Sequence, residues 1–314
     1  MNATAALQKP DACLLRAGNT NCGGCGMSVG LTMLGRALVE ADESCSLVIP
    51  ACCGIVAAGA FPTTSYGVPT IAATFASSAA VASGYASIRD LNDEPGQVIC
   101  WAGDGGTYDI GFATVSAAAE RNENIIYICY DNEIYGNTGG QRSSATPAGA
   151  RTTTTPAGKA ENKKDIMSIM AAHGIPYAAT LSMAHPEDFS RKLATALSMT
   201  GMRFLLMHSP CPTGWKSEPE DSVELVRIAV ASGLFPVYEV FDGSRYRINV
   251  NPDDSDPAEY FHRQRRFKDA DIDLEATRRY CKERSQRLQL LAREYPVAQQ
   301  VGQSQRLPVR NHRQ

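Results

Sequence analysis

Two cysteines stand three residues apart in a glycine-rich stretch near the start of the chain. They are Cys22 and Cys25 in NCGGCG, and the whole chain carries ten cysteines. Thiolates at this spacing can bind a zinc ion, ligate an iron–sulfur cluster, or form a redox-active pair. A zinc knuckle needs a second close pair with the same spacing, and the sequence has none. The remaining cysteines therefore bear on the choice between the other uses.

Most of the other cysteines fall into two groups. Cys100 and Cys129 lie in the apolar runs QVICWAGD and IIYICYDN, where a thiol behaves as a small hydrophobic group, so we expect both in the core. No motif surrounds Cys13, Cys45 and Cys281. The candidates for chemistry are then Cys22, Cys25, the adjacent pair Cys52 and Cys53, and Cys211. A secreted disulfide scaffold would be shorter and would follow a signal sequence, which the first residues do not resemble.

A second candidate site follows an apolar run in CWAGDGGTYDIG. Gly103, Gly105 and Gly106 allow backbone N–H groups to approach a phosphate, and the helix that follows favours negative charge. Asp104 would repel a phosphate unless a cation lay between them. The motif therefore predicts a divalent metal that bridges Asp104 and a diphosphate.

The next strand end supplies matching groups. The run IIYICYDNE ends with Asn132 and Glu133, and Ile134, Asn137 and Thr138 follow it, with Gly139 and Gly140 after them. An amide oxygen, a backbone carbonyl, a carboxylate and phosphate oxygens make a suitable shell for Mg²⁺. Because parallel strands end at one edge of a sheet, the two segments are expected to lie together.

The elements that must position these groups follow an α/β pattern. Apolar strands alternate with helices of ordinary length, which predicts a doubly wound, mostly parallel sheet covered on both faces. Leu31, Leu34 and Leu38 mark the buried face of the first helix. Strands are expected at 46–53, 97–102, 123–132 and 203–211, and helices at 27–41, 71–91, 108–122, 164–174 and 185–201.

The chain changes character twice outside this pattern. Residues 135–164 show no periodicity, which is typical of a functional or interaction loop. A hairpin is expected around Asp242–Gly243, and charged residues crowd the segment after it. We therefore expect a cofactor domain over 1–240, and over 241–314 a hairpin with a charged arm that contacts another subunit.

Taken together, the motifs resemble one family. AGDGGTYDIG and YDNEIYGNTGGQRSSATP resemble the thiamine-diphosphate fingerprint. Their combination with NCGGCG is similar to the catalytic β subunit of 2-oxoacid:ferredoxin oxidoreductases, over about residues 16–240. Within the family the whole chain resembles most the oxalate-cleaving enzymes and next the pyruvate enzymes.

The resemblance implies thiamine diphosphate, Mg²⁺ and one four-iron four-sulfur cluster as cofactors. It assigns the cluster to Cys22, Cys25, Cys52 and Cys211, with Cys53 as the alternative third ligand. Magnesium is assigned to Asp104, Asn132 and the carbonyl of Ile134. The diphosphate is assigned to Gly103, Gly105, Gly106, Asn137 and Thr138, with Cys52 and Met27 beside the cofactor. Asn137 is expected to reach the reacting centre. The family commonly has glutamate where Met27 stands.

The implied activity is oxidative cleavage of oxalate to CO₂, with electrons passed through the cluster to ferredoxin. One alternative is the conversion of pyruvate and coenzyme A to acetyl-coenzyme A. A non-redox thiamine decarboxylase is another, but it would have no use for four placed cysteines, and a simple electron carrier would not need the diphosphate site. The glutamate that activates the cofactor is expected from a partner subunit, and a further subunit is expected to carry more clusters. The net charge of −3 gives no reason to expect nucleic acid or membrane as a partner, and a cytoplasmic location is expected.

Overall fold

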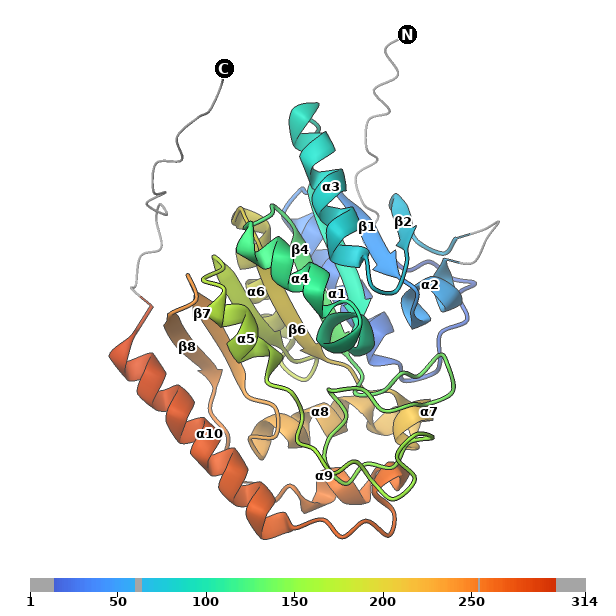
Figure 1. Cartoon of the computed structure of the whole chain (residues 1–314), viewed down its shortest axis with the longest axis vertical. Coiled ribbons are helices and arrows are strands. Elements are labelled where there is room, and N and C mark those ends of the chain that lie inside the picture. The colour runs from blue at the N-terminus through green and yellow to red at the C-terminus, as the bar shows by residue number, and fades with distance from the viewer. Residues whose placement is uncertain (1–13, 60–63, 254, 298–314) are drawn as a thin grey trace.

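A single mixed sheet forms the centre of the protein (Figure 1). The computed structural model describes residues 14–59, 64–253 and 255–297. The sheet has eight strands in the order β2-β1-β3-β4-β6-β5-β7-β8. In chain order the strands are β1 (Cys45–Pro50), β2 (Thr70–Ala73), β3 (Gln97–Gly103), β4 (Ile126–Asp131), β5 (Tyr177–Leu181), β6 (Arg203–His208), β7 (Val237–Phe241) and β8 (Arg245–Val250).

The first six strands in this chain order are parallel, as predicted for an α/β protein. Every residue of β1, β4, β5, β6 and β7 is buried, because helices cover both faces of the sheet. The carboxyl ends of β1, β3, β4 and β6 therefore meet at one edge, which lies toward α7 and α9 in Figure 1. This edge carries both predicted sites.

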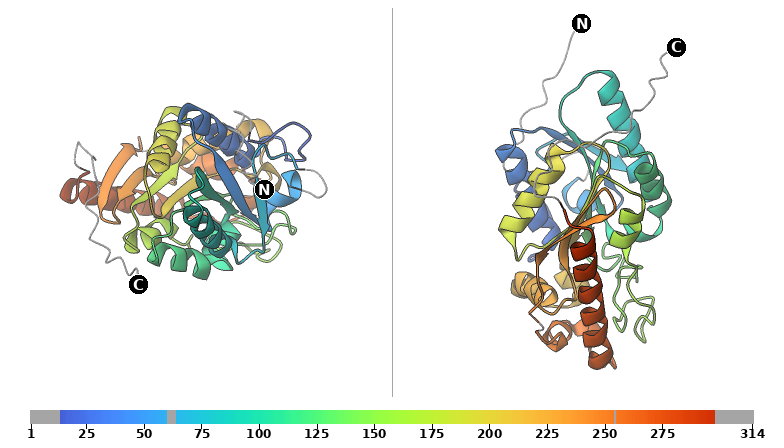
Figure 2. Two further views of the ribbon diagram at one scale, coloured as in Figure 1. Left: turned by 90° about the horizontal axis from the view of Figure 1, so that it is seen from above. Right: turned by 90° about the vertical axis from the view of Figure 1, so that its left-hand side faces the viewer.

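Helices pack on the two faces in separate groups (Figure 2). α1 (Gly26–Glu40) and α6 (Pro186–Ser198) pack together on one face, and α3 (Ser78–Leu91), α4 (Phe112–Glu120) and α5 (Ile166–Ala172) lie on the other. The remaining helices are α2 (Cys53–Ala58), α7 (Pro212–Trp215), α8 (Ser222–Ala231), α9 (Ala258–His262) and α10 (Leu274–Glu294). Within the described part of the chain, no helix is both long and apolar enough to cross a membrane.

The expected helix over 71–91 is wrong in its first third. Thr70–Ala73 forms the edge strand β2, with Ile71 opposite Val48 of β1, and the helix begins only at Ser78. The stretch is too short to show a period of its own, so pairing with the neighbouring strand decides its conformation. The strand β5 was not expected at all, since its small alanines and short length give little sequence signal.

The helix expected over 108–122 also begins late. Residues Gly105–Asp109 form a wide π-helical turn, and α4 starts at Phe112. A side chain at Gly111 would place its Cβ 1.9 Å from the carbonyl oxygen of Gly106, so only glycine allows this close return of the chain. Such π-helical turns are frequent at functional sites.

The hairpin around Asp242–Gly243 extends the main sheet. β7 runs antiparallel to β5, and β8 runs antiparallel to β7. Asp242 and Gly243 have φ of 48° and 67°, the left-handed values that a tight hairpin turn requires. The expected domain boundary at residue 240 therefore falls inside a hairpin whose two strands belong to one sheet.

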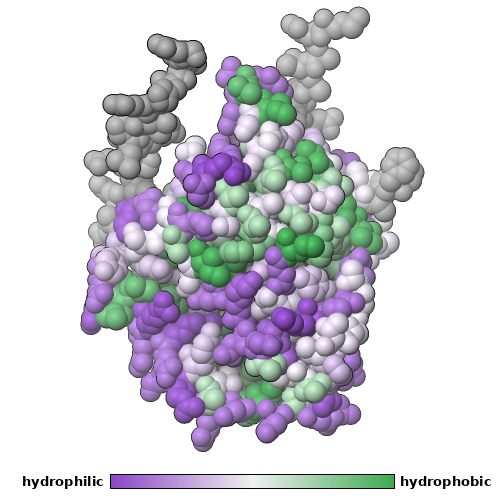
Figure 3. Space-filling view, viewed as in Figure 1, coloured by the Kyte–Doolittle hydropathy of each residue, from purple (hydrophilic) through white to green (hydrophobic). Residues whose placement is uncertain are grey.

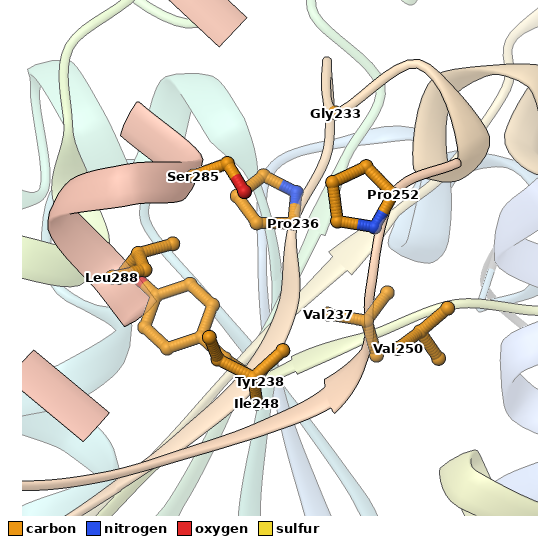
Figure 4. Close-up of a pocket in the computed structure, with 9 residues that line it drawn as sticks. All are labelled: Gly233, Pro236, Val237, Tyr238, Ile248, Val250, Pro252, Ser285 and Leu288. Atoms are coloured by element: carbon orange, nitrogen blue, oxygen red, sulfur yellow. The ribbon is translucent and has the colours of Figure 1, made fainter. Parts of the chain in front are cut away.

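The long helix α10 packs against this hairpin (Figure 4). Ser285 and Leu288 of α10 face Tyr238 of β7, Ile248 of β8 and Pro236, the residue just before β7. The gap between them has a volume of about 10 Å³, room for roughly one water molecule. This contact is therefore a packing interface and not a ligand site. Whether the charged segment contacts another subunit remains a prediction.

Candidate functional site

Three oxygen-bearing groups meet where β3 and β4 end. One terminal amide atom of Asn132 lies 2.7 Å from the carbonyl oxygen of Ile134 and 2.8 Å from Oδ1 of Asp104. Both neighbours are acceptors, so either the amide NH₂ donates to them or the amide oxygen joins them around a cation. Neighbouring oxygens of an octahedral Mg²⁺ site, with the metal 2.0–2.1 Å from each, stand about 2.9 Å apart. The three predicted metal ligands thus fit Mg²⁺.

The electrostatics of Asp104 also suit a cation. Its side chain is 1% exposed, and the hydroxyl of Ser143 donates a hydrogen bond to its Oδ2. Burial, and then the nearby Asp131 carboxylate, raise the pKa of Asp104 well above its usual range. A divalent cation at Oδ1 would favour the ionised form and offset both effects.

The turn that carries Asn132 and Ile134 has an unusual backbone. Glu133, between them, has φ of 63°, in the left-handed region that a residue with a side chain rarely adopts. Such a conformation costs on the order of 1–3 kcal/mol and persists only where its surroundings impose it. The turn directs the Asn132 amide and the Ile134 carbonyl toward the same point.

A lysine that the sequence reasoning missed holds this turn. Nζ of Lys163 lies 2.6 Å from Oδ2 of Asp131 and 2.9 Å from Oε1 of Glu133. The hydroxyl of Tyr108 donates to the same Asp131 carboxylate at 2.7 Å. Burial alone would raise the pKa of Glu133, but Lys163 and Arg266 outweigh it and lower the pKa to about 2. Lys163 closes the aperiodic loop, and nothing in its local sequence distinguishes it from Lys164.

The predicted diphosphate glycines differ in what they require. A Cβ on Gly105 would lie 2.0 Å from Cε1 of Tyr135, whereas the nearest atoms to a Cβ on Gly103 or Gly106 stand at 3.4 and 3.5 Å. Of these three positions, therefore, only Gly105 has no room for a side chain. Its absent side chain makes room for the Tyr135 ring, whose hydroxyl donates to Asp109.

Asn137 and Thr138 lie on an exposed turn beyond this site. The hydroxyl of Thr138 donates to the side-chain oxygen of Gln141 at 2.5 Å, and Gly139 and Gly140 follow with φ of 113° and 83°. Within the described residues the Asn137 side chain makes no hydrogen bond of its own. Its expected role at the reacting centre stays a prediction.

The predicted cluster cysteines come together from three segments. A Cβ added to Gly136 would lie 3.8 Å from Sγ of Cys211 and 3.9 Å from Sγ of Cys53. The hydroxyl of Thr213 donates to Sγ of Cys22 at 3.5 Å, which brings the first loop to α7. The structure thus gathers residues that are far apart in the sequence beside the Gly136 turn.

Backbone contacts join two of these cysteine segments directly. The amide of Gly26, next to Cys25, donates to the carbonyl of Pro210, next to Cys211, at 3.0 Å. In the described part of the chain no three Cys, His, Asp or Glu side chains are close enough to share one metal ion. A four-iron cube is larger than a single ion and spreads its thiolates more widely, so the open arrangement fits a cluster better than zinc.

The geometry separates Cys52 from Cys53. Burial raises the pKa of the Cys53 thiol to about 12, and the charges of Cys211, Cys52, Cys25 and Cys22 raise it further. Burial also raises the pKa of Cys52, but hydrogen bonds from Tyr130 and from the backbone of Gly103 oppose this. Sγ of Cys53 also lies with Sγ of Cys211 beside the Gly136 turn, whereas the thiol of Cys52 is hydrogen-bonded to Tyr130 and near Gly103 at the end of β3.

Met27 and the two strand cysteines lie in the hydrophobic core. Met27 is buried on α1, and Cys100 and Cys129 are fully buried in β3 and β4. The core position predicted for both cysteines is confirmed. Cys13 lies outside the described residues.

A separate cavity of about 570 Å³ opens behind Lys163, between the sheet, α5, α8 and α10. Tyr108, His208 and Tyr260 are among the residues that line it. Neither Asp104 nor any of the candidate cluster cysteines lines this cavity, so it is distinct from the predicted cofactor site.

The face covered by α3 and α4 carries exposed apolar residues (Figure 3). Ile88 and Leu91 of α3 are 58% and 83% exposed, and Ile110, just before α4, is 56% exposed. Large apolar side chains in such number on one face are typical of an interaction surface.

Comparison with known proteins defines the class first. Residues 51–207 match the family model described as thiamine pyrophosphate enzyme, C-terminal TPP binding domain. The fold agrees with a solved 2-oxoglutarate:ferredoxin oxidoreductase from Magnetococcus marinus, with a TM-score of 0.61 and 22% identity over 82% of this chain and 92% of that one.

Two curated relatives define the family more narrowly. The ketoisovalerate oxidoreductase subunit VorB of Pyrococcus horikoshii is 42% identical over 88% of this chain and 92% of its own length. The pyruvate synthase subunit PorB of Methanocaldococcus jannaschii is 42% identical over 87% of this chain and 95% of its own length. The chain therefore belongs to the 2-oxoacid:ferredoxin oxidoreductase family, as its thiamine-pyrophosphate-binding β subunit. The narrower expectation of an oxalate enzyme finds no support in these relatives.

Proposed function

We propose that the chain carries the thiamine-diphosphate, Mg²⁺ and four-iron cluster sites of a pyruvate:ferredoxin oxidoreductase. The convergence of Asp104, Asn132 and Ile134 is the observation that carries the cofactor assignment. Relatives of equal identity are named for pyruvate and for ketoisovalerate, so a branched 2-oxoacid is the second candidate substrate.

Each group of residues has a stated part in this proposal. Asp104, Asn132 and the Ile134 carbonyl hold Mg²⁺, which in turn holds the diphosphate. Gly103, Gly105, Gly106, Asn137 and Thr138 form the diphosphate surroundings. Thiamine diphosphate, when bound, supplies the carbanion chemistry that cleaves the bond next to the 2-oxo group.

Cys22, Cys25, Cys53 and Cys211 are proposed as the cluster ligands. The choice of Cys53 over Cys52 as third ligand is supported by the position of Sγ of Cys53 beside Sγ of Cys211 at the Gly136 turn. Cys52 then stands between the cluster and the end of β3, near Gly103. Electrons leaving the cofactor have a short path to the cluster, because both sites lie at one sheet edge.

The activating glutamate is proposed to come from a partner subunit. The exposed apolar face over α3 and α4 is the surface that supports such a contact. The 2-oxoacid pocket is then completed only in the assembled complex. Ferredoxin is the proposed electron acceptor.

The test is an anaerobic assay on the complex that co-purifies with the chain. Reduction of a low-potential dye is measured with pyruvate and coenzyme A, with ketoisovalerate and coenzyme A, and with oxalate alone. We expect activity with pyruvate that depends on coenzyme A and on bound thiamine diphosphate. Activity with oxalate alone would overturn the substrate assignment, and a complex without iron or thiamine diphosphate would overturn the function.

A further inference from the structure

One arginine from the C-terminal segment contacts a residue beside each predicted site: Glu133, between two predicted metal ligands, and Trp215, at the end of the helix that follows Cys211. Arg266 lies in a short turn, Arg265–Phe267, after α9, and its side chain is 1% exposed. We propose that Arg266 is a positioning residue. It fixes the turn at residues 132–134, which carries two predicted metal ligands, relative to α7, the short helix that follows Cys211. This inference rests on the proposed cofactor sites.

The first contact of Arg266 is with the strained turn. Its Nη2 lies 2.5 Å from Oε2 of Glu133, while Lys163 binds the other oxygen of the same carboxylate at 2.9 Å. Glu133 is the residue in the left-handed conformation between the two predicted metal ligands. The buried Arg266 and the partly exposed Lys163 each bind one oxygen of this carboxylate, and together they hold the turn in a conformation that is otherwise unfavourable.

The second contact is with α7. The guanidinium carbon of Arg266 stands 4.3 Å from the centre of the Trp215 ring, within the range of a favourable cation–π contact. The indole N–H of Trp215 donates to the carbonyl of Asn132 at 2.7 Å, and its backbone N–H donates to the carbonyl of Cys211 at 2.7 Å. Trp215 thus links a metal-ligand residue to a cluster cysteine, and Arg266 covers its ring.

The turn Arg265–Phe267, which carries Arg266, also forms hydrogen bonds with neighbouring loops. The carbonyl of Arg266 accepts a hydrogen bond from the amide of Arg151 at 2.8 Å, and its Nε donates to Oε1 of Gln264 at 2.9 Å. The amide of Arg265 donates to the carbonyl of Lys216, one residue beyond α7. The two backbone bonds fix the position of the Arg266 main chain, and the bond from Nε to Gln264 helps to orient the guanidinium toward Glu133.

The Arg266–Glu133 pair itself supports a positioning role over a merely stabilising one. A buried ion pair is a poor source of net stability, because both ions lose their hydration. The side chains of Arg266 and Glu133 are only 1% and 5% exposed, and Glu133 is the residue between the two predicted metal ligands. The pair is therefore placed to fix the turn that carries those ligands.

The decisive experiment measures two sites in one variant. Arg266→Met keeps the length and apolar contact of the side chain but removes both the ion pair and the cation over Trp215. We expect the Kd of thiamine diphosphate with Mg²⁺, measured by equilibrium dialysis on the complex, to rise about tenfold or more. We also expect a changed electron paramagnetic resonance spectrum of the reduced cluster, at unchanged iron content.

Two controls separate positioning from general damage. Arg265→Met alters the neighbouring arginine, which is exposed, and is expected to leave the Kd and the spectrum unchanged. Arg266→Lys restores the charge without the planar fork and is expected to recover part of the affinity. If Arg266→Met fails to assemble, Trp215→Phe removes the hydrogen bond to Asn132 and reduces the ring under Arg266, and it is expected to weaken cofactor binding about fivefold or more.

The outcomes distinguish this inference from the proposed function. A wild-type complex without iron or without thiamine-diphosphate binding overturns the proposed function, and this inference with it. A wild-type complex that binds both, together with an Arg266→Met variant of unchanged Kd and spectrum, overturns the positioning role alone. Equal losses in Arg265→Met and Arg266→Met would also overturn it.

Discussion

Substitution of single glycines in the NCGGCG motif tests how the cysteine loops fit together. Gly26 follows Cys25 and lies against the segment that precedes Cys211. A Cβ at Gly26 would stand 2.8 Å from Cε of Met183, 2.8 Å from Oγ of Ser209 and 2.9 Å from Cδ of Pro210. Gly26→Ala must therefore move one cysteine loop away from the other.

The size of the effect follows from these distances. Ordinary contact begins near 3.4 Å, so the new methyl group is about half an ångström too close to each of these three atoms. Met183 can turn its flexible end aside and the Ser209 hydroxyl can rotate, but Cδ of Pro210 belongs to a ring that is fixed to the backbone just before Cys211. Overpacking of this kind costs typically about 1–3 kcal/mol, and the hydrogen bond from Gly26 to Pro210 is stretched at the same time.

The assay compares iron content and the cluster spectrum after anaerobic purification of the complex. We expect Gly26→Ala to lose iron or to hold a cluster that falls apart faster on exposure to a chelator. Gly23→Ala is the matched control, because its nearest neighbour would be Cβ of Pro219 at 4.0 Å. Gly24→Ala should be worse than either, since Gly24 has φ of 71° and its Cβ would lie 2.4 Å from the carbonyl oxygen of Pro219.

A folded Gly26→Ala complex with full iron and an unaltered spectrum would refute the reasoning. It would mean that the close approach of the Cys25 and Cys211 loops is not needed for the cluster. Loss of iron in Gly23→Ala would refute it as well, because that position has room for a methyl group.

Further predictions concern single residues. Asp104→Ala should abolish binding of thiamine diphosphate and leave the iron–sulfur absorbance in place; retained cofactor would remove Asp104 from the metal site. Cys53→Ala should lose iron and Cys52→Ala should keep it, and the reverse result would restore Cys52 as the third ligand. Burial lowers the pKa of His208 to about 3. The charge of Glu133 opposes this shift, and the charges of Lys163 and Arg266 add to it. Between pH 6.5 and 3 the unfolded chain therefore binds a proton at His208 that the folded chain does not. The free energy of unfolding consequently falls as the pH drops below 6.5, by up to about 1.4 kcal/mol per pH unit. The difference in denaturation midpoint between pH 7 and pH 5 should shrink in His208→Gln, and an unchanged difference would contradict this. Gly84→Ala, on exposed α3 with no atom within 4 Å of the new Cβ, should raise the free energy of unfolding by about 0.5–1 kcal/mol, and a lower thermal midpoint would count against it.

Much of the α/β architecture could be predicted from local patterns. The apolar runs at β1, β3, β4 and β6 are strands with every central residue buried, because both faces of a parallel sheet are covered. The helix with Leu31, Leu34 and Leu38 on one face buries all three. By contrast, Thr70–Ala73 is too short to show a periodic pattern of apolar residues, and pairing with β1 makes it a strand.

The predicted metal ligands illustrate what a motif can determine. Asp104, Asn132 and Ile134 follow two strand ends, and parallel strands present such ends at one edge. One terminal amide atom of Asn132 does lie within hydrogen-bonding distance of the Ile134 carbonyl oxygen and of Oδ1 of Asp104. The residue types and the α/β pattern were enough to predict this arrangement, because a parallel sheet brings the ends of its strands to one edge.

The support beneath the ligands was decided only by the tertiary structure. Lys163 and Arg266 come from 30 and 133 residues away to bind one carboxylate, and no local pattern marks either residue. The direction of Cys53 toward Cys211, rather than that of Cys52, depends on where α2 begins and on which loop packs beside it. The sequence by itself determined which chemical groups are present and at which edge of the sheet they gather. Long-range packing decided which of two adjacent thiols lies beside Cys211 and which two cations hold the strained turn, because those choices depend on contacts between segments that only folding brings together.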